Sequence, residues 1–385
     1  MRLARALSFV RAAGNRALWT AICLGLLLLA VASDSAASER KKLRRYLYVA
    51  TPGIRNYLEY GGHGLVVFDI DDGHKFVQCI PFDGLDEQRR PLNVKGICAS
   101  AATGRIYLTT LKHLICLDLA SRKVLWERKY DMGCDRMSIT PDGRSIYLPS
   151  LEGPLWYVVD AENGEVIRRL VTDSGAHNTI CGPSGAHAYL AGLRSPALRL
   201  VDTTSHEIRT VGPFSAAIRP FTIDGRERFC FVNVNELLGF EVGDLASGRK
   251  LHRVEVQGFT QGRTKRHGCP SHGIGMTPDE TELWVCDAAN SRMHLFDATV
   301  MPPVQLGSIE LRDQPGWITF GIDGQYAYPS TGDVIDVKAR KIVARLTDEN
   351  GQAVQSEKLL EIDWRGLHIV AAGDQFGIGG KRASD

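Results

Sequence analysis

The stretch ITPDGRSIYL at residues 139–148 contains the pattern that decides the fold. An Asp-Gly pair stands there between two short runs rich in β-branched and aromatic residues. The central positions of a tight hairpin turn favour residues that tolerate positive φ, so this arrangement is a strong β-hairpin signal. The same pattern returns in MTPDETELWV at residues 276–285, with Glu280 in place of the glycine. The two stretches predict the same kind of hairpin at distant points of the chain.

Related hairpins occur along most of the sequence, and each is followed by an apolar run that ends in an acidic residue. These acidic ends recur about every 44 residues, a period typical of stacked repeat folds. They are Asp69, Asp118, Asp160, Asp202, Glu241, Asp297 and Asp336. Each unit supplies four short strands, and no stretch has helical periodicity long enough to cover a parallel sheet. A small sheet cannot bury both faces alone, whereas copies arranged around an axis bury them and protect their edges.

We therefore expect an all-β fold, a seven-bladed β-propeller of four-stranded antiparallel blades over residues 43–370, followed by a C-terminal tail at 371–385. The units span residues 46–82, 94–130, 135–172, 176–215, 217–256, 271–311 and 315–347. The first unit lacks its innermost strand, and residues 359–366 fit that strand. The ring would then close by pairing of the N- and C-terminal segments. Residues 367–370 look like one more strand, which leaves eight blades as the alternative.

The units resemble the YVTN-type repeat of YncE-like seven-bladed propellers, within the WD40/YVTN repeat-like superfamily. The resemblance covers residues 43–370, and its best copies are 139–148 and 276–285. It implies the propeller fold but leaves the function open, because one fold hosts many functions. Similar repeats occur in surface-layer proteins, in quinoprotein amine dehydrogenases, in nitrous oxide reductases and in some lactonases.

The N-terminus has the features of a secretory signal peptide. Four arginines precede an apolar run at residues 17–32, and small residues follow up to Ala37. This order predicts a cleaved signal over residues 1–37. An uncleaved anchor is the alternative, although the apolar run is shorter than the roughly 20 residues that span a bilayer. We expect a periplasmic or extracellular protein, attached to the membrane only if this segment is retained.

Composition and charge exclude several classes of protein. A content of 44% hydrophobic and 23% charged residues is that of a folded soluble chain rather than a disordered or multi-span membrane protein. The net charge is +2, and the predicted signal carries four arginines and one aspartate, so no nucleic-acid partner is expected. The nine cysteines form no CxxC motif, which argues against c-type haem and the usual zinc spacing. Their disulfide pattern stays open.

A ring of polar side chains is expected at one mouth of the channel. The innermost strand of each blade lines the axis, so the residues that enter these strands gather at one opening. Alignment of the units on the Asp-Gly turn places Asp135, His177, His272 and Lys358 at the same position, with Lys95 beside it in another unit. The predicted ligand site consists of Asp135, Arg136, His177, Asn178, Arg219, His272 and Trp317. The alternative is that this polar mouth is simply solvated.

Two further features complete the predicted sites. His177 and His272 are a candidate pair of ligands for a single metal ion, since imidazole binds copper, zinc and iron; no other cofactor is expected. Long loops at 52–60, 83–91 and 257–267 are candidates for partner binding, because Tyr and Arg are favoured at interfaces. The predicted loop contacts are Arg55, Tyr57, Arg263, Arg266 and His267.

The sequence favours a non-catalytic module that binds a small molecule or a protein, or acts as a scaffold. It contains no GxSxG, HExxH, phosphate-binding glycine loop or EF-hand loop, so catalytic residues stay unknown. The alternative that the resemblance implies is an enzyme or enzyme subunit, similar to quinoprotein dehydrogenases or metal-dependent lactonases. Single-stranded DNA binding, suggested for some YncE-like propellers, would need an electropositive face.

Overall fold

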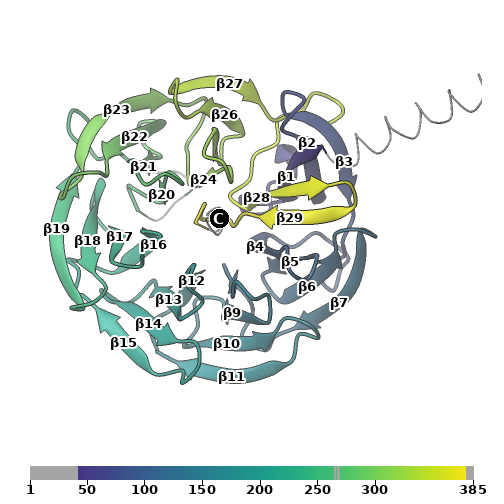
Figure 1. The fold of residues 1–385 in the computed structure, drawn as a ribbon, viewed down its shortest axis with the longest axis horizontal. Coiled ribbons are helices and arrows are strands. Elements are labelled where there is room, and N and C mark those ends of the chain that lie inside the picture. The colour runs from purple at the N-terminus through teal and green to yellow at the C-terminus, as the bar shows by residue number, and fades with distance from the viewer. Residues whose placement is uncertain (1–41, 264–265, 267–268, 379–385) are drawn as a thin grey trace, which may run out of the picture. The chain divides into compact units, whose positions relative to one another are not determined.

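A computed structural model describes residues 42–263, 266 and 269–378. Its contacts divide the chain into two parts, one of residues 45–363 with 369–385 and one of residues 1–44 with 364–368. The first part holds nearly all the described residues, and its strands form the ring of sheets in Figure 1. The predicted signal segment, 1–37, lies outside the described residues. Within the described residues, no helix has the length and apolar character needed to cross a membrane.

Seven antiparallel sheets make up the ring, and six of them have four strands that follow one another in chain order. The first sheet contains β1 (Leu43–Thr51), β2 (Gly64–Asp69), β3 (Lys75–Ile80), β28 (Leu359–Arg365) and β29 (His368–Ala372), with the 3-10 helix η1 (Leu58–Tyr60) after β1. The second and third contain β4 (Val94–Ser100), β5 (Arg105–Thr110), β6 (His113–Asp118), β7 (Lys123–Lys129), and β8 (Ser138–Ile139), β9 (Ser145–Pro149), β10 (Leu155–Asp160), β11 (Val166–Val171). The fourth and fifth contain β12 (Ala176–Cys181), β13 (His187–Gly192), β14 (Leu198–Asp202), β15 (Ile208–Val211), and β16 (Ile218–Ile223), β17 (Phe229–Val234), β18 (Gly239–Asp244), β19 (Arg249–Glu255). The sixth and seventh contain β20 (Ile274–Met276), β21 (Glu282–Asp287), β22 (Arg292–Asp297), β23 (Val304–Glu310), and β24 (Ile318–Phe320), β25 (Tyr326–Pro329), β26 (Asp333–Asp336), β27 (Lys341–Arg345).

The predicted fold is confirmed: the chain is an all-β, seven-bladed propeller. Strand β28 lies beside β1, and the backbone N–H of Ala50 donates to the carbonyl of Lys358 at 2.9 Å. The expected pairing of the N- and C-terminal segments therefore closes the ring. Strand β29 joins this first sheet as a fifth strand, so residues 367–370 do not begin an eighth blade.

The Asp-Gly turn shows why the repeat folds as it does. Gly143 has a φ of 72°, in the left-handed region that glycine adopts without strain. The hydroxyl of Thr140 donates to the Asp142 carboxylate at 2.6 Å and holds the turn together. At the equivalent place Glu280 takes a φ of 61°, and its carboxylate accepts the backbone N–H of Gly225 on the neighbouring blade at 2.8 Å. That bond to the next blade helps to hold Glu280 in a backbone conformation that is unfavourable for a residue with a Cβ.

The core lies between neighbouring blades, where large apolar side chains from successive sheets interlock. Phe240 of the fifth blade and Phe296 of the sixth meet edge to face, with ring centroids 5.1 Å apart. Trp284 of the sixth blade and Phe320 of the seventh meet in the same way at 5.3 Å. Such pairs add to the burial of apolar area that drives folding. The blades therefore stabilise one another rather than fold as separate units.

Residues 373–378, which follow β29, pack inside the ring. The backbone carbonyl of Gln375 accepts the indole N–H of Trp317 at 2.5 Å and the hydroxyl of Thr319 at 2.8 Å. The side-chain amide of Gln375 donates to the carbonyl of Met137 at 2.8 Å. The ring of Phe376 packs against that of Trp317, with centroids 5.3 Å apart. This segment thus links the third and seventh blades across the interior.

Ring closure can be tested at Leu359, which is buried at the start of β28 against side chains of the first and seventh blades. Leu359→Ala should lower the free energy of unfolding by about 2–5 kcal/mol, because it leaves a cavity in the seam that closes the ring. Urea denaturation followed by tryptophan fluorescence measures the change. Ile167→Ala on the exposed strand β11 is the matched control and should change stability by about 0.5 kcal/mol or less. Equal effects of the two substitutions would contradict this account of the closure.

Candidate functional site

One mouth of the channel holds a cavity of about 230 Å³. Six of the seven blades contribute side chains to its wall. Six of these side chains are cationic, and two, Glu152 and Glu357, are carboxylates. The cationic side chains are Arg55, Lys95, Arg136, Arg219, Arg266 and Lys358. The cavity wall is therefore strongly basic in a protein whose net charge is only +2.

The repeat places four of these cationic side chains together with His177, because all five stand where a blade begins its innermost strand; Arg55 and Arg266 come from long loops. Lys95, His177 and Arg219 are each the second residue of an inner strand, in β4, β12 and β16. Arg136 comes just before β8, and Lys358 just before β28. Since all inner strands enter the ring from the same end, equivalent positions of different blades meet at one opening.

A buried arginine forms the floor of the cavity. The guanidinium of Arg136 lies 3.5 Å from the centroid of the Trp317 ring and donates through Nη2 to Glu357 at 2.8 Å. Arg136 is only 3% exposed, so this stacking and the ion pair compensate for the loss of water around the charge. Its Nε and Nη1 have no hydrogen-bond partner among the described residues. The floor thus contains a buried cation whose hydrogen bonds are incompletely satisfied.

A histidine and an aspartate form a hydrogen-bonded pair in the wall. Nδ1 of His177 lies 2.6 Å from Oδ2 of Asp135, and the ammonium of Lys95 lies 3.3 Å from Oδ1 of the same carboxylate. Burial opposes ionisation of Asp135, but His177, Lys95 and Arg136 outweigh it and hold the pKa of this carboxyl at about 2. Burial lowers the pKa of His177, against the attraction of Asp135. Near neutral pH the pair is therefore a carboxylate beside a neutral imidazole.

Lys358 is the most perturbed cation of the cavity. Its ammonium donates to the carbonyl of Gly53 and to the Glu357 carboxylate, both at 2.8 Å. Burial lowers the pKa of Lys358 to about 7; Glu357 opposes the shift, while Arg136 and Lys95 add to it. A lysine of this kind changes its charge in the physiological range of pH.

The first and third long loops meet at the rim. The guanidinium of Arg55 donates to the backbone carbonyl of Arg266 at 2.9 Å. Arg266 donates to the hydroxyl of Tyr60 at 2.9 Å and to Asp313 at 2.8 Å. Tyr57 packs edge-on against Tyr60, with ring centroids 6.1 Å apart. These contacts fix two of the cationic side chains over the opening.

The structure brings together many, but not all, of the residues predicted from the sequence. Those that line the cavity are Arg55, Arg136, His177, Arg219, Arg266 and His272. Asp135 lies behind His177, and Trp317 lies under Arg136. Asn178 is fully buried, and neither end of its amide has a hydrogen-bond partner among the described residues. Arg263 is exposed and is not part of the cavity wall, while His267 lies outside the described residues.

Three charged wall residues that form ion pairs in the site, Lys95, Glu357 and Lys358, were not among the predicted site residues. Lys358 and Lys95 occupy the aligned ring position or its neighbour, so the repeat itself carried their signal. Glu357 gave no such signal, because its role as partner of both Arg136 and Lys358 depends on the closure of the ring.

The two histidines predicted to bind a metal ion, His177 and His272, have no third metal ligand beside them among the described residues. Nδ1 of His272 lies 2.9 Å from the carbonyl of Gly316, and Nδ1 of His177 is taken up by Asp135. Over the described residues, no group of three or more His, Cys, Asp or Glu side chains is placed to hold a metal ion. None of the described cysteines forms a disulfide.

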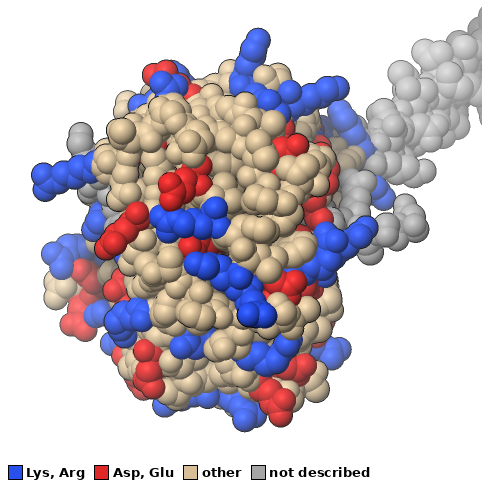
Figure 2. Space-filling model, turned by 90° about the vertical axis from the view of Figure 1, so that its left-hand side faces the viewer, with Lys and Arg blue, Asp and Glu red and all other residues tan. Residues whose placement is uncertain are grey.

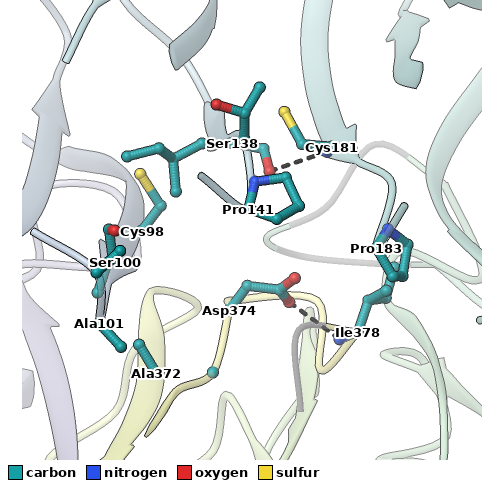
Figure 3. Close-up of a pocket in the computed structure, with 15 residues that line it drawn as sticks. Cys98, Ser100, Ala101, Ser138, Pro141, Cys181, Pro183, Ala372, Asp374 and Ile378 are labelled. Carbon is teal, nitrogen blue, oxygen red and sulfur yellow. Dashed lines mark hydrogen bonds between the residues drawn. The ribbon is translucent and has the colours of Figure 1, made fainter. Parts of the chain in front are cut away.

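A second cavity, of about 220 Å³, lies between the inner strands and the C-terminal segment (Figure 3). It is lined mainly by small and apolar residues, with Cys98, Cys181 and Asp374 among them. The Ser138 hydroxyl accepts the backbone N–H of Cys181 at 3.0 Å, and Asp374 accepts that of Ile378 at 3.1 Å. In this cavity these polar groups of the wall are therefore already bonded within the protein.

A third cluster joins Asp287, His294 and Ser308 on the outer half of the sixth blade. His294 lies 3.0 Å from Asp287 through Nε2 and 2.7 Å from the Ser308 hydroxyl through Nδ1. None of the three lines either cavity described above. The bonds connect β21, β22 and β23, so we assign them to holding these strands together.

Titration of Lys358 should be visible in the stability of the protein. Because its pKa is near 7 when folded and near 10.4 when unfolded, the unfolded chain binds more protons between these values. Stability of the wild type relative to Lys358→Met should therefore rise as pH increases from about 7 to about 10. Urea denaturation of both proteins across this range measures the difference. A difference that stays constant with pH would show that Lys358 titrates normally.

Comparisons with solved structures identify other propellers. The chain is similar to a dihydro-heme d1 dehydrogenase, NirN, in complex with DHE, with a TM-score of 0.53 and 16% identity over 78% of this chain and 72% of that one. It is also similar to the β-propeller domain of Cps50 (Swd1) from Myceliophteria thermophila, with a TM-score of 0.55 and 12% identity over 69% of this chain and 86% of that one. No protein-family model and no curated protein matches the sequence. At these identities the likeness shows the propeller fold alone.

Proposed function

We propose that the protein is an exported propeller of the YVTN-repeat type that binds a small anionic ligand in the basic cavity at the channel mouth. The observation that carries the proposal is the wall itself, in which six cationic side chains converge on one small space with only two carboxylates. Export is inferred from the signal-like N-terminus, and the family from the repeat.

The charge of the wall supports an anion rather than a neutral ligand. Arg136 is buried and keeps two guanidinium nitrogens without a hydrogen-bond partner among the described residues. These two nitrogens have almost no accessible surface, so Arg136 acts on the cavity through its positive charge, which favours a carboxylate or a phosphate. Arg219 offers a second guanidinium, held by its Nε bond to Asn235 at 2.6 Å. The two arginines thus come from different blades and are positioned before a ligand arrives.

The size of the cavity supports a small ligand. Its volume of about 230 Å³ lies below the roughly 300–1,000 Å³ of sites for drug-sized molecules. The space suits a short organic acid or a phosphate-bearing molecule better than a long polymer. On the outer face that Figure 2 presents, Lys and Arg side chains are interspersed with Asp and Glu, so the basic character is not continued there as a large patch. A nucleic-acid partner is therefore not favoured.

An enzyme is the second candidate function. The solved structure of a dehydrogenase is similar in fold, but its identity of 16% gives no argument about chemistry. The observation that favours catalysis is the bond between Asp135 and His177 in the cavity wall.

The proposal predicts saturable binding of small anions that depends on Arg219. Isothermal titration calorimetry with inorganic phosphate, malonate and pyruvate should detect binding of at least one of them, weakened by added salt. Arg219→Gln removes one cation without burying a new charge and should weaken binding about tenfold or more, a loss of about 1.4 kcal/mol.

The matched control is Arg209→Gln, which removes an exposed cation from the outer strand β15 and should leave the affinity unchanged. Absence of binding of all three anions to the wild-type protein would overturn the proposed function. Equal weakening by both substitutions would show that the effect is one of net charge and not of the cavity.

A further inference from the structure

The pair of Asp135 and His177 fixes which nitrogen of the imidazole can meet a ligand. Nδ1 lies 2.6 Å from the Asp135 carboxylate, and Asp135 is fully buried, so Nδ1–H donates to it. The other nitrogen, Nε2, is then the unprotonated one. His177 lines the cavity, so Nε2 is the atom left to accept a proton from a bound molecule.

Asp135 is the neighbour that favours His177 as a proton acceptor, whereas burial and the cations Lys95 and Arg136 lower the pKa of the imidazole. Asp135 stabilises the imidazolium that forms when Nε2 takes a proton, as the orienting carboxylate does in other histidine bases. The ammonium of Lys95 forms an ion pair with the second oxygen of Asp135 at 3.3 Å, which helps to keep this carboxylate in place.

The cations of the same wall can stabilise the ligand after it has lost a proton. Removing a proton from an anionic ligand leaves an additional negative charge on that ligand. Arg136, Arg219 and Lys358 line the space in which this charge would form. Positioned cations that meet a developing charge in a site with little water are among the largest contributions to catalysis.

We propose that the cavity is an active site in which Nε2 of His177 removes a proton from the carbon next to the carbonyl of a small oxo acid. This inference rests on the proposed function, because the cations that bind the carboxylate also bind the product of the step. The C–H bond breaks, its electron pair stays on the ligand as an enolate, and the proton bonds to Nε2. The reverse step returns a proton from the imidazolium to the same carbon. The step needs no oxidant, reductant or second substrate.

Hydrogen exchange tests the proposal directly. Pyruvate and 2-oxobutyrate are incubated with the protein in D₂O, and the loss of signal from the hydrogens beside the carbonyl is followed by proton NMR. The wild-type protein should accelerate exchange above the rate in buffer. His177→Gln should lower that acceleration by about 100-fold or more, the contribution typical of a general base. Arg209→Gln on the outer strand should exchange at the wild-type rate.

Asp135→Asn tests the positioning role of the carboxylate. It should lower kcat for exchange and leave KM near the wild-type value, since Asp135 acts through His177 and not on the ligand. A merely structural role of Asp135 would not separate the two constants in this way. If circular dichroism shows that His177→Gln does not fold, Asp135→Asn serves in its place as the test of the proposed base: an unchanged kcat for exchange would then overturn the inference.

The outcomes separate the inference from the proposed function. If pyruvate or 2-oxobutyrate binds in calorimetry but exchanges hydrogen only at the buffer rate, the proposed active site is wrong. The proposed anion-binding function would still hold. Exchange that persists in folded His177→Gln would show that another group is the base and would also overturn the inference. Absence of any anion binding would overturn both.

Discussion

A single buried charge, the guanidinium of Arg136, determines how the centre of this propeller is built. An ion removed from water is strongly unfavourable unless other groups take the place of water. Here the Trp317 ring covers one face of the guanidinium, and the Glu357 carboxylate pairs with its edge. The three residues come from the third blade, the seventh blade and the segment that closes the ring. The position of Arg136 therefore depends on a complete ring and not on its own blade.

The same dependence extends from the basic cavity into the interior. Trp317, which lies under Arg136, also donates its indole N–H to the backbone of Gln375. Gln375 follows the last strand of the chain and is bonded to Met137, the residue next to Arg136. Substitution of Gly273 itself would disturb this stack, because a Cβ at that position would lie only 2.7 Å from the Cα of Trp317. The floor of the cavity is thus held from below by the C-terminal segment.

The fold was predictable because its signal is repeated, whereas the site was predictable only in part. The Asp-Gly turn requires a left-handed backbone conformation at Gly143. Because turns of this kind recur in several blades, their spacing in the sequence gives the length of the repeat. Alignment of the repeat also predicts that His177, His272 and Lys358 meet at one opening. It cannot predict that Glu357, the neighbour of Lys358 in the chain, pairs with Arg136, since this contact joins residues more than two hundred positions apart. Nor does it predict the route of Gln375, because no repeat unit contains that segment.

A crystal structure of the protein soaked in selenate measures the central claim most directly, because anomalous scattering from selenium locates the anion without reference to the rest of the map. The account predicts a selenium peak inside the basic cavity, within hydrogen-bond distance of Arg219 or of another cationic side chain of the wall. Selenate found only on the outer strands, with the cavity unoccupied by any anion, would contradict it.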